Sequence, residues 1–239
     1  DAAVSKTAAL FRRLQTLEGY GVMRLQHAHI ASASLRFVNL SGCRALASLR
    51  LECPSLSELT LQNCREISSD AISDIGRTCQ ALRCLDLCGC SRLAALELSS
   101  RSLTTLRLSG CTKLQHLVLE CAALEELFLR GCEGCTQEDL AAALAASPLL
   151  RRLDLTSCSK LTDLTLQHAK VSDLRLFWCG SLQRTSLTCP ALRRLTLQIP
   201  AGTGDEEGAS VGVARLGDVP RLAELHLADI EAMDAEDFA

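Results

Sequence analysis

Hydrophobic residues recur along most of this chain in one short pattern, Leu-x-x-Leu-x-Leu, in which Val or Ile can replace Leu. The pattern begins at Leu35, Leu56, Leu82, Leu103, Leu124, Leu150, Val171, Leu192 and Leu222. Successive starts are 21, 26, 21, 21, 26, 21, 21 and 30 residues apart. Alternation of apolar and other residues is typical of a strand with one buried face. The pattern therefore predicts one short strand per repeat, with its leucines pointing into the protein.

A period of roughly 20 to 30 residues is typical of a leucine-rich-repeat solenoid. In this architecture each coil of the chain adds one short strand to a curved parallel sheet. The residues between the leucines then point outward onto the concave face. We therefore predict an α/β fold, a leucine-rich-repeat solenoid with mostly extended short coils and occasional helices on the convex side.

The two coil lengths predict different return paths. Short coils carry a second leucine pattern after the strand, which predicts extended structure, at Leu46, Leu93, Leu114, Leu161 and, less perfectly, Leu182. The 26-residue coils instead contain SSDAISDIGRTC (68 to 79) and TQEDLAAALAASP (136 to 148). Cap residues at Ser69 and Thr136, followed by apolar residues at helical spacing, predict a convex helix in about every third coil.

Cysteines follow the same period. Seven of them come directly after the predicted strands, at Cys43, Cys64, Cys90, Cys111, Cys132, Cys158 and Cys179. Three more, Cys53, Cys121 and Cys189, are 68 residues apart, which is the length of two short coils and one long coil. Free cysteine is among the most buried residue types, and a small buried side chain there can pack and satisfy backbone groups. We expect reduced thiols and an intracellular protein, cytoplasmic or nuclear.

The repeat also predicts the boundaries along the chain. Residues 1–34, where the pattern degrades, are expected to form an N-terminal capping or partial repeat. The repeat domain spans 35–230. Within it the Gly-rich, acidic stretch at 200–218 predicts a mobile loop with a short helix near its end. Residues 231–239 form an acidic C-terminal tail.

Composition and charge exclude some classes of binding partner. Apolar residues make up 48% of the 239 residues and the net charge is −3, with Lys and Arg spread along the chain. Nucleic-acid binding needs a clustered basic surface, so we expect no nucleic-acid partner. No apolar run approaches the roughly 18 to 20 residues of a membrane span, so we expect no membrane partner either.

The stretch CREISSDAISDIGRTCQALRCLDLCGC, residues 64 to 90, resembles the cysteine-containing leucine-rich repeat of F-box/LRR proteins. The matching positions are Cys64, Ile67, Ile72, Ile75, Cys79, Leu82, Leu85, Leu87 and Cys90. The resemblance covers roughly residues 35 to 230 and implies a curved, substrate-binding surface of a ubiquitin ligase receptor. In that family a separate F-box docks on Skp1 of a cullin ligase. This chain has no recognisable F-box, so the resemblance implies a Skp1–cullin partner only if an F-box lies upstream.

Candidate chemistry is sparse. Cys132 and Cys135 have the spacing of half a zinc site but no second ligand pair follows, and Cys135 aligns with the core position of Ile67. Cys84 and Cys88 are expected to face outward beside Asp86. Five histidines lie in different coils, and the register suggests no Ser or Cys partner for them: His27, His29, His116, His168 and His226. We expect no catalytic residue, no cofactor and no metal. A thiol- or metal-dependent enzyme using Cys84, Cys88 or His226 is the alternative.

The outward positions of the predicted strands carry the main functional hypothesis. Aromatic residues and arginine are enriched at the centres of protein interfaces, whereas only 3% of this chain is aromatic. The outward positions of neighbouring predicted strands include three aromatic residues, three arginines and one aspartate: Arg107, Phe128, Arg130, Asp154, Arg175, Phe177 and Trp178. We predict a non-enzymatic protein–protein interaction module that binds a protein partner on its concave face. Two alternatives stay open: a scaffold subunit of a large assembly, for example ciliary or organellar, and a Trp178 that packs on the Gly110 and Gly131 turns.

Overall fold

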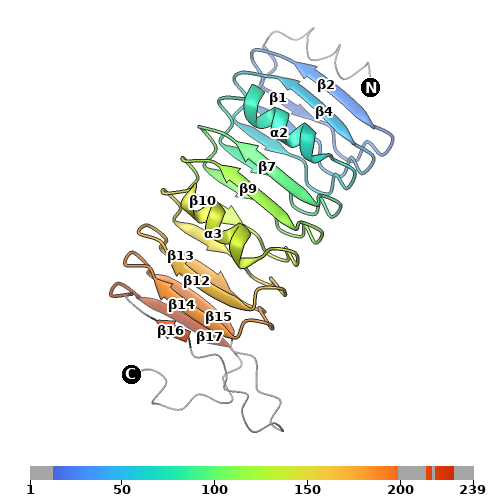
Figure 1. Ribbon diagram of the computed structural model, residues 1–239. Helices are drawn as coiled ribbons and strands as arrows, with labels where there is room; N and C mark the ends of the chain where they lie inside the picture. The colour runs from blue at the N-terminus through green and yellow to red at the C-terminus, as the bar shows by residue number, and fades with distance from the viewer. Residues whose placement is uncertain (1–12, 199–213, 217–218, 229–239) are drawn as a thin grey trace.

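The computed structural model describes residues 13–198, 214–216 and 219–228, and its main element is one long parallel sheet. Ten strands follow one another in chain order across this sheet (Figure 1). They are β1 (Thr16–Glu18), β3 (Phe37–Asn39), β5 (Glu58–Thr60), β6 (Cys84–Asp86), β8 (Thr105–Arg107), β10 (Glu126–Phe128), β11 (Arg152–Asp154), β13 (Asp173–Leu176), β15 (Arg194–Gln198) and β17 (Glu224–Ala228). Each coil of the chain thus contributes one strand.

Equivalent positions of neighbouring coils pair with each other in this sheet. Leu85 is opposite Leu59 on one side and Leu106 on the other, and all three side chains are fully buried. A slip of one residue would turn every leucine of a strand outward, so the hydrophobic pattern fixes the register. We call the opposite, outward surface of this sheet the sheet face.

A second layer covers the buried side of the long sheet. It consists of β2 (His27–Ala31), β4 (Ser48–Glu52), α2 (Ser69–Thr78), β7 (Ala95–Ser99), β9 (His116–Glu120), α3 (Gln137–Ala145), β12 (Asp163–Gln167), β14 (Arg184–Thr188) and β16 (Ala214–Leu216). In Figure 1 the two helices lie in the same layer as these strands, α2 between β4 and β7 and α3 between β9 and β12. The prediction that long coils carry helices and short coils carry strands is confirmed.

The helices begin at polar caps. Thr136 caps α3 as predicted and forms a capping box with Asp139. The cap of α2 is Ser68 rather than the predicted Ser69, because the Ser68 hydroxyl accepts a hydrogen bond from the Ala71 amide at 3.2 Å. Gly76 brings α2 close to β7, where an added Cβ would lie 2.7 Å from the Ser99 carbonyl oxygen.

The predicted cysteine row lies inside the stack, and each thiol donates a hydrogen bond to a backbone carbonyl of the preceding coil. The Sγ–O distances are 3.1 to 3.4 Å, from Cys43 to Gly19, Cys64 to Leu40, Cys90 to Leu61, Cys111 to Leu87, Cys132 to Leu108, Cys158 to Leu129 and Cys179 to Leu155. The second cysteine row is buried too and makes longer contacts of the same kind. All fourteen cysteines are free thiols.

Two predicted boundary regions differ in outcome. Residues 1–34 contain β1 and β2, which extend both layers by one coil. Within the loop predicted at 200–218, residues 214–216 form a strand, β16, which pairs with β14 where a short helix was expected. The strand continues the β12–β14 sheet, so cross-strand pairing decides the structure there. The rest of that loop and the acidic tail 231–239 lie outside the described residues.

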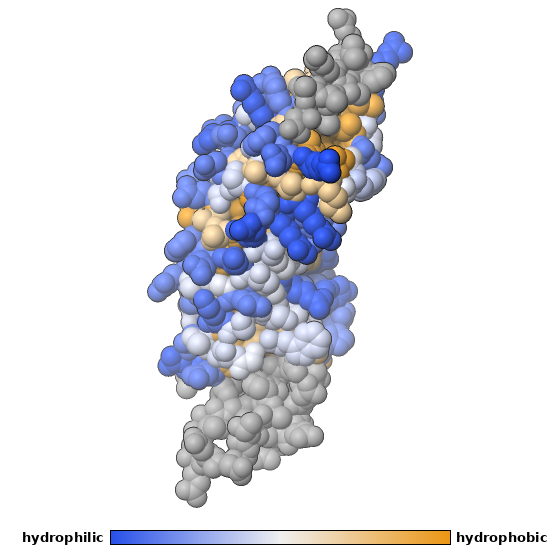
Figure 2. All heavy atoms as spheres, turned by 90° about the vertical axis from the view of Figure 1, so that its right-hand side faces the viewer, coloured by the Kyte–Doolittle hydropathy of each residue, from blue (hydrophilic) through white to orange (hydrophobic). Residues whose placement is uncertain are grey.

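This α/β arrangement, with ten short parallel strands and two helices among the described residues, is compatible with the predicted solenoid. Figure 2 shows one side of the molecule, where hydrophilic residues predominate and hydrophobic ones appear in separate patches. In the part of the chain that the structure describes, neither helix has the length and apolar character needed to cross a membrane.

Candidate functional site

A row of residues with left-handed backbone conformation runs along the turns that follow the strands of the long sheet. We call it the left-handed row, and its members are Gly21, Gly42, Asn63, Gly89, Gly110, Gly131, Ser157 and Trp178, with φ between 56° and 78°. All but Gly21 immediately precede a cysteine of the first row. Glycine adopts this conformation without steric cost and asparagine tolerates it, whereas a bulky residue there is strained.

Trp178 is the outlier of the left-handed row. Its φ is 56°, its side chain packs on the Phe177 ring with centroids 5.0 Å apart, and the residue is 55% exposed. The preceding coil has Ser157 at the equivalent place. More than half of the residue is therefore open to solvent, while the alternative in which Trp178 packs on the Gly110 and Gly131 turns stays a prediction. A large aromatic ring is held at the surface by a backbone conformation that suits glycine.

A pocket of about 530 Å³ opens on the sheet face beside Trp178. Five of the seven predicted residues line it: Arg130, Asp154, Arg175, Phe177 and Trp178. The other two, Arg107 and Phe128, lie on the adjoining strands β8 and β10, with the guanidinium carbon 5.8 Å from the ring centroid. The pocket also contains residues that the sequence hypothesis did not include, Thr156, Asp173, Arg194, Thr196, Glu224 and His226.

Some of these additional residues belong to a ladder of alternating charge at the start of the strands. Register places Glu126, Arg152, Asp173, Arg194 and Glu224 opposite one another in that order. Glu126 binds Arg152 at 2.8 Å, Arg152 Nε lies 3.5 Å from Asp173 Oδ2, and Arg194 binds Glu224 at 3.0 Å. Opposite charges directly across a sheet stabilise it. We call these five residues the charge ladder. In the sequence they lie two residues before the outward positions Phe128, Asp154, Arg175, Thr196 and His226, so the repeat pattern could have located them.

Buried carboxylates form the floor of the sheet face. Asp154 Oδ1 accepts a hydrogen bond from the Thr156 amide at 3.0 Å, and Asp86 accepts one from the Cys88 amide at the same distance. Asp173 Oδ1 lies 3.5 Å from Arg175 Nε. The two hydrogen bonds hold Asp154 and Asp86 in place, while Asp173 and Asp86 attract Arg175 and Arg107 beside them.

The thiols of the sheet face are poor nucleophiles. Cys84 and Cys88 are half-buried and lie two residues before and two residues after Asp86. Burial raises the pKa of Cys84, and burial together with the hydrogen bond to Asp86 raises the pKa of Cys88 to about 11. Both are protonated at neutral pH, whereas a catalytic thiol needs a lowered pKa.

Cys132 and Cys135 are separate core residues. The Cys132 thiol donates to the Leu108 carbonyl at 3.2 Å, and Cys135 is 4% exposed, at the core position expected from its alignment with Ile67. Within the described ranges, His, Cys, Asp and Glu side chains form no group of three or more that is arranged to hold a metal ion.

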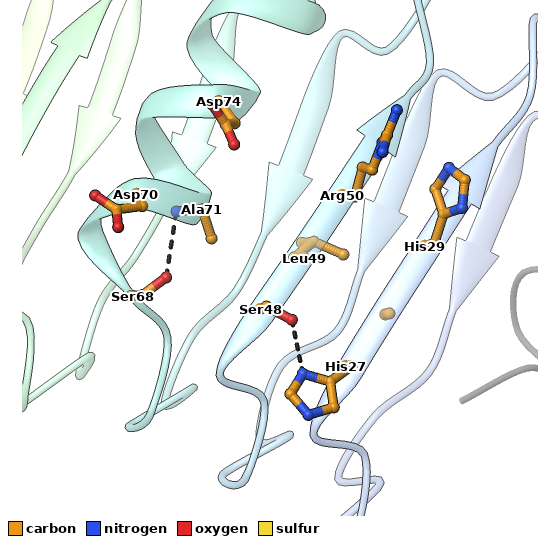
Figure 3. A pocket seen from close by; sticks show the side chains of 10 residues that line it. His27, His29, Ser48, Leu49, Arg50, Ser68, Asp70, Ala71 and Asp74 are labelled. Atoms are coloured by element: carbon orange, nitrogen blue, oxygen red, sulfur yellow. Dashed lines mark hydrogen bonds between the residues drawn. The ribbon is translucent and has the colours of Figure 1, made fainter.

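A second pocket, of about 570 Å³, lies between β2, β4 and the start of α2 (Figure 3). Here the Ser48 hydroxyl is 2.8 Å from His27 Nδ1, so the expectation that no histidine has a Ser partner is wrong. The register of β2 and β4 places these two residues opposite each other. Both are exposed, and no carboxylate among the described residues bonds the His27 ring. This pair therefore lacks the third group that orients the histidine of a catalytic triad.

No protein-family model matches the chain, and no curated protein matches it.

Proposed function

We propose that this protein is a leucine-rich-repeat protein of the F-box/LRR-like type that binds a protein partner through the sheet face. The repeat period, the matching cysteine row and the ten-stranded parallel sheet support the repeat assignment. The raised pKa values of Cys84 and Cys88 favour binding over thiol catalysis at this face.

The observation that carries this proposal is Trp178. A non-glycine residue in the left-handed region costs of order 1–3 kcal/mol, and such strain clusters at functional sites. Glycine at this position would relieve it, as at Gly131 of an earlier coil. The protein instead exposes a tryptophan next to Phe177 and Arg175, the residue types that dominate binding energy in protein interfaces.

The sheet face is also rigid enough to present these side chains. The strands pair in one register, and the charge ladder holds Arg152 and Arg194 from the neighbouring strands. The backbone of the sheet and these two arginines are therefore already ordered before a partner binds, which lowers the entropic cost of binding.

Within this proposal, two cellular roles compete. The resemblance of residues 64 to 90 to F-box/LRR repeats favours the substrate-recognition half of a ubiquitin ligase, with Skp1 and a cullin bound through an F-box upstream. A permanent scaffold subunit is the alternative. Fourteen free thiols favour a reducing, intracellular compartment for both.

The test compares three forms of the full-length protein purified gently from its own cells, with quantitative mass spectrometry of the bound proteins. Trp178→Gly removes the ring at a position where glycine fits, and Val118→Ser changes another exposed apolar residue on β9, away from the sheet face. A partner that is lost with Trp178→Gly and kept with Val118→Ser supports the proposal. A partner kept by both variants contradicts it. Skp1 and a cullin in the bound set indicate a ligase receptor, and a fixed equimolar set without them indicates a scaffold.

A further inference from the structure

Charges on the sheet face lie at two depths. The carboxylates form the buried layer, since Asp86, Asp154 and Asp173 are only 4%, 8% and 7% exposed. The arginines form the outer layer: the side chains of Arg107 and Arg175 are 43% and 49% exposed, and Arg130 is exposed as well. These three arginines therefore lie further out than the three aspartates, and the exposed carboxylate of the pocket lining is that of Glu224, which is paired with Arg194.

The outer arginines have donors to spare. In the described part of the chain, no carboxylate pairs with Arg130. Arg175 has Asp173 at 3.5 Å, and that carboxylate is shared with Arg152 at the same distance. A guanidinium group has five N–H donors and binds a carboxylate through two parallel hydrogen bonds.

Two further carboxylates, the half-buried Glu126 and the exposed Glu224, already have partners. Glu126 and Glu224 bind Arg152 and Arg194 of the charge ladder at 2.8 and 3.0 Å. The two glutamates lie two residues before the outward positions of Phe128 and His226. Neither of them pairs with Arg130 or Arg175.

An apolar contact lies beside Arg130 and Arg175 in the same pocket. Phe177 follows Arg175 by two residues on the same face, and its ring packs against the exposed Trp178 ring. Both aromatic residues line the same pocket as Arg130 and Arg175.

From this arrangement we infer that the sheet face recognises an acidic segment of its protein partner. Carboxylates of the segment bind Arg130 and Arg175, and an apolar side chain next to them packs on Phe177 and Trp178. The inference rests on the proposed function and adds the chemistry of the partner. The buried carboxylate floor orients the arginines, and it disfavours an anion that is small enough to sink below them.

The direct test uses short synthetic peptides and the fluorescence of Trp178, the only tryptophan of the chain. The probe is a peptide in which glutamates flank one leucine, and matched peptides have glutamine or lysine in place of glutamate. We expect a saturable change in emission with the glutamate peptide that weakens with added salt. Equal or tighter binding of the glutamine or lysine peptide would overturn the inference.

Charge reversal locates the site. Arg130→Glu, with no ion pair to break, is expected to weaken glutamate-peptide binding about tenfold, which corresponds to about 1.4 kcal/mol. Arg65→Glu is the matched control, because Arg65 is an exposed arginine without an ion pair among the described residues and lies in the coil of β5. Unchanged affinity of Arg130→Glu, or an equal loss with Arg65→Glu, contradicts the site. Circular dichroism checks that both variants are folded.

The natural partner separates the failure of this inference from the failure of the proposed function. If Trp178→Gly releases the partner but Arg130→Glu with Arg175→Gln does not, the sheet face is the binding surface and the acidic chemistry is wrong. If none of the three substitutions releases it, the proposed function fails as well.

Discussion

Two rows of residues that are neighbours in sequence, the first cysteine row and the left-handed row, respond differently to the repeat. From Cys43 to Cys179 the first cysteine row has cysteine in every coil, whereas the left-handed row has glycine in most coils but Asn63, Ser157 and Trp178 in three of them. The cysteine must fill a core site and donate to the preceding coil, so its chemistry is specified. The turn needs only a backbone conformation. Its side chain is therefore available for binding wherever the protein tolerates the strain.

The largest change in the free energy of unfolding is expected at alkaline pH, which acts on the thiols of the first cysteine row. Burial raises the pKa of Cys64 and Cys111 to about 12 from an ordinary value of 9.0. Below pH 9 these thiols are protonated in both states and the stability is fully present. As pH rises further, the unfolded chain loses protons first, so the free energy of unfolding falls by about 1.4 kcal/mol per pH unit and thiol.

Urea unfolding followed by circular dichroism across the alkaline range measures this loss. Because several thiols act together, the midpoint should fall steeply from about pH 9 and stay constant between about pH 7 and 8. A midpoint that is flat up to about pH 10.5 would show that the buried row does not titrate as inferred.

Removing one thiol of the buried row should have a smaller effect. Cys132→Ala deletes the Sγ atom that contacts the Leu108 carbonyl and leaves a small cavity, which should cost about 1–2 kcal/mol in the free energy of unfolding. The half-buried Cys84 on the sheet face is the control, where Cys84→Ala should stay within about 0.5 kcal/mol. An equal loss of unfolding free energy at both sites would contradict the expected difference between buried and half-buried thiols.

A substitution in the left-handed row should cost about 1 kcal/mol through backbone strain alone. At Gly131 an added Cβ would be 3.8 Å from its nearest neighbour, so Gly131→Ala introduces no clash. Gly180 also has open space around it but its φ is not positive, and Gly180→Ala is therefore the control, expected to be neutral or slightly stabilising. Thermal or urea unfolding of the two variants gives the difference, and a neutral Gly131→Ala would argue against strain in this row.

Trp178→Gly should have the smallest effect on stability, and in the opposite direction. Relief of strain is offset by the entropy of glycine in the unfolded chain and by the lost contact with Phe177, so we expect a gain of no more than about 1 kcal/mol. The same variant should lose partner binding. A large loss of stability instead would make Trp178 a packing residue and would weaken the proposed function.

Most of the fold follows from the sequence because one period specifies it. Leu59, Leu85 and Leu106 could be placed in the core, and both helices located, from alternation and cap residues alone. The cap of α2 was misplaced by one residue because Ser68 and Ser69 are chemically equal, and only the hydrogen bond to the Ala71 amide distinguishes them.

The site was less predictable. The sequence hypothesis does not include Asp173, because it considers only the outward positions in the second half of each leucine pattern. The register of the sheet pairs Asp173 with Arg152 and Arg194. The contact between His27 and Ser48 depends on the pairing of two return strands. The conformation of Trp178 had a signal in the glycines at equivalent positions of other coils, but tryptophan has no tendency to adopt it, so position in the repeat was the only clue.

The buried cysteine row has a further consequence for how long the protein survives. While the coils are stacked, thiols of neighbouring coils are shielded from solvent oxidants. Any opening of the stack releases several of them together, each 21 or 26 residues from the next along a now flexible chain. Oxidation then joins thiols that the stacked coils keep apart, and the opened chain cannot close again. Its lifetime in air therefore depends on how often and for how long the stack opens, because each opening can become irreversible.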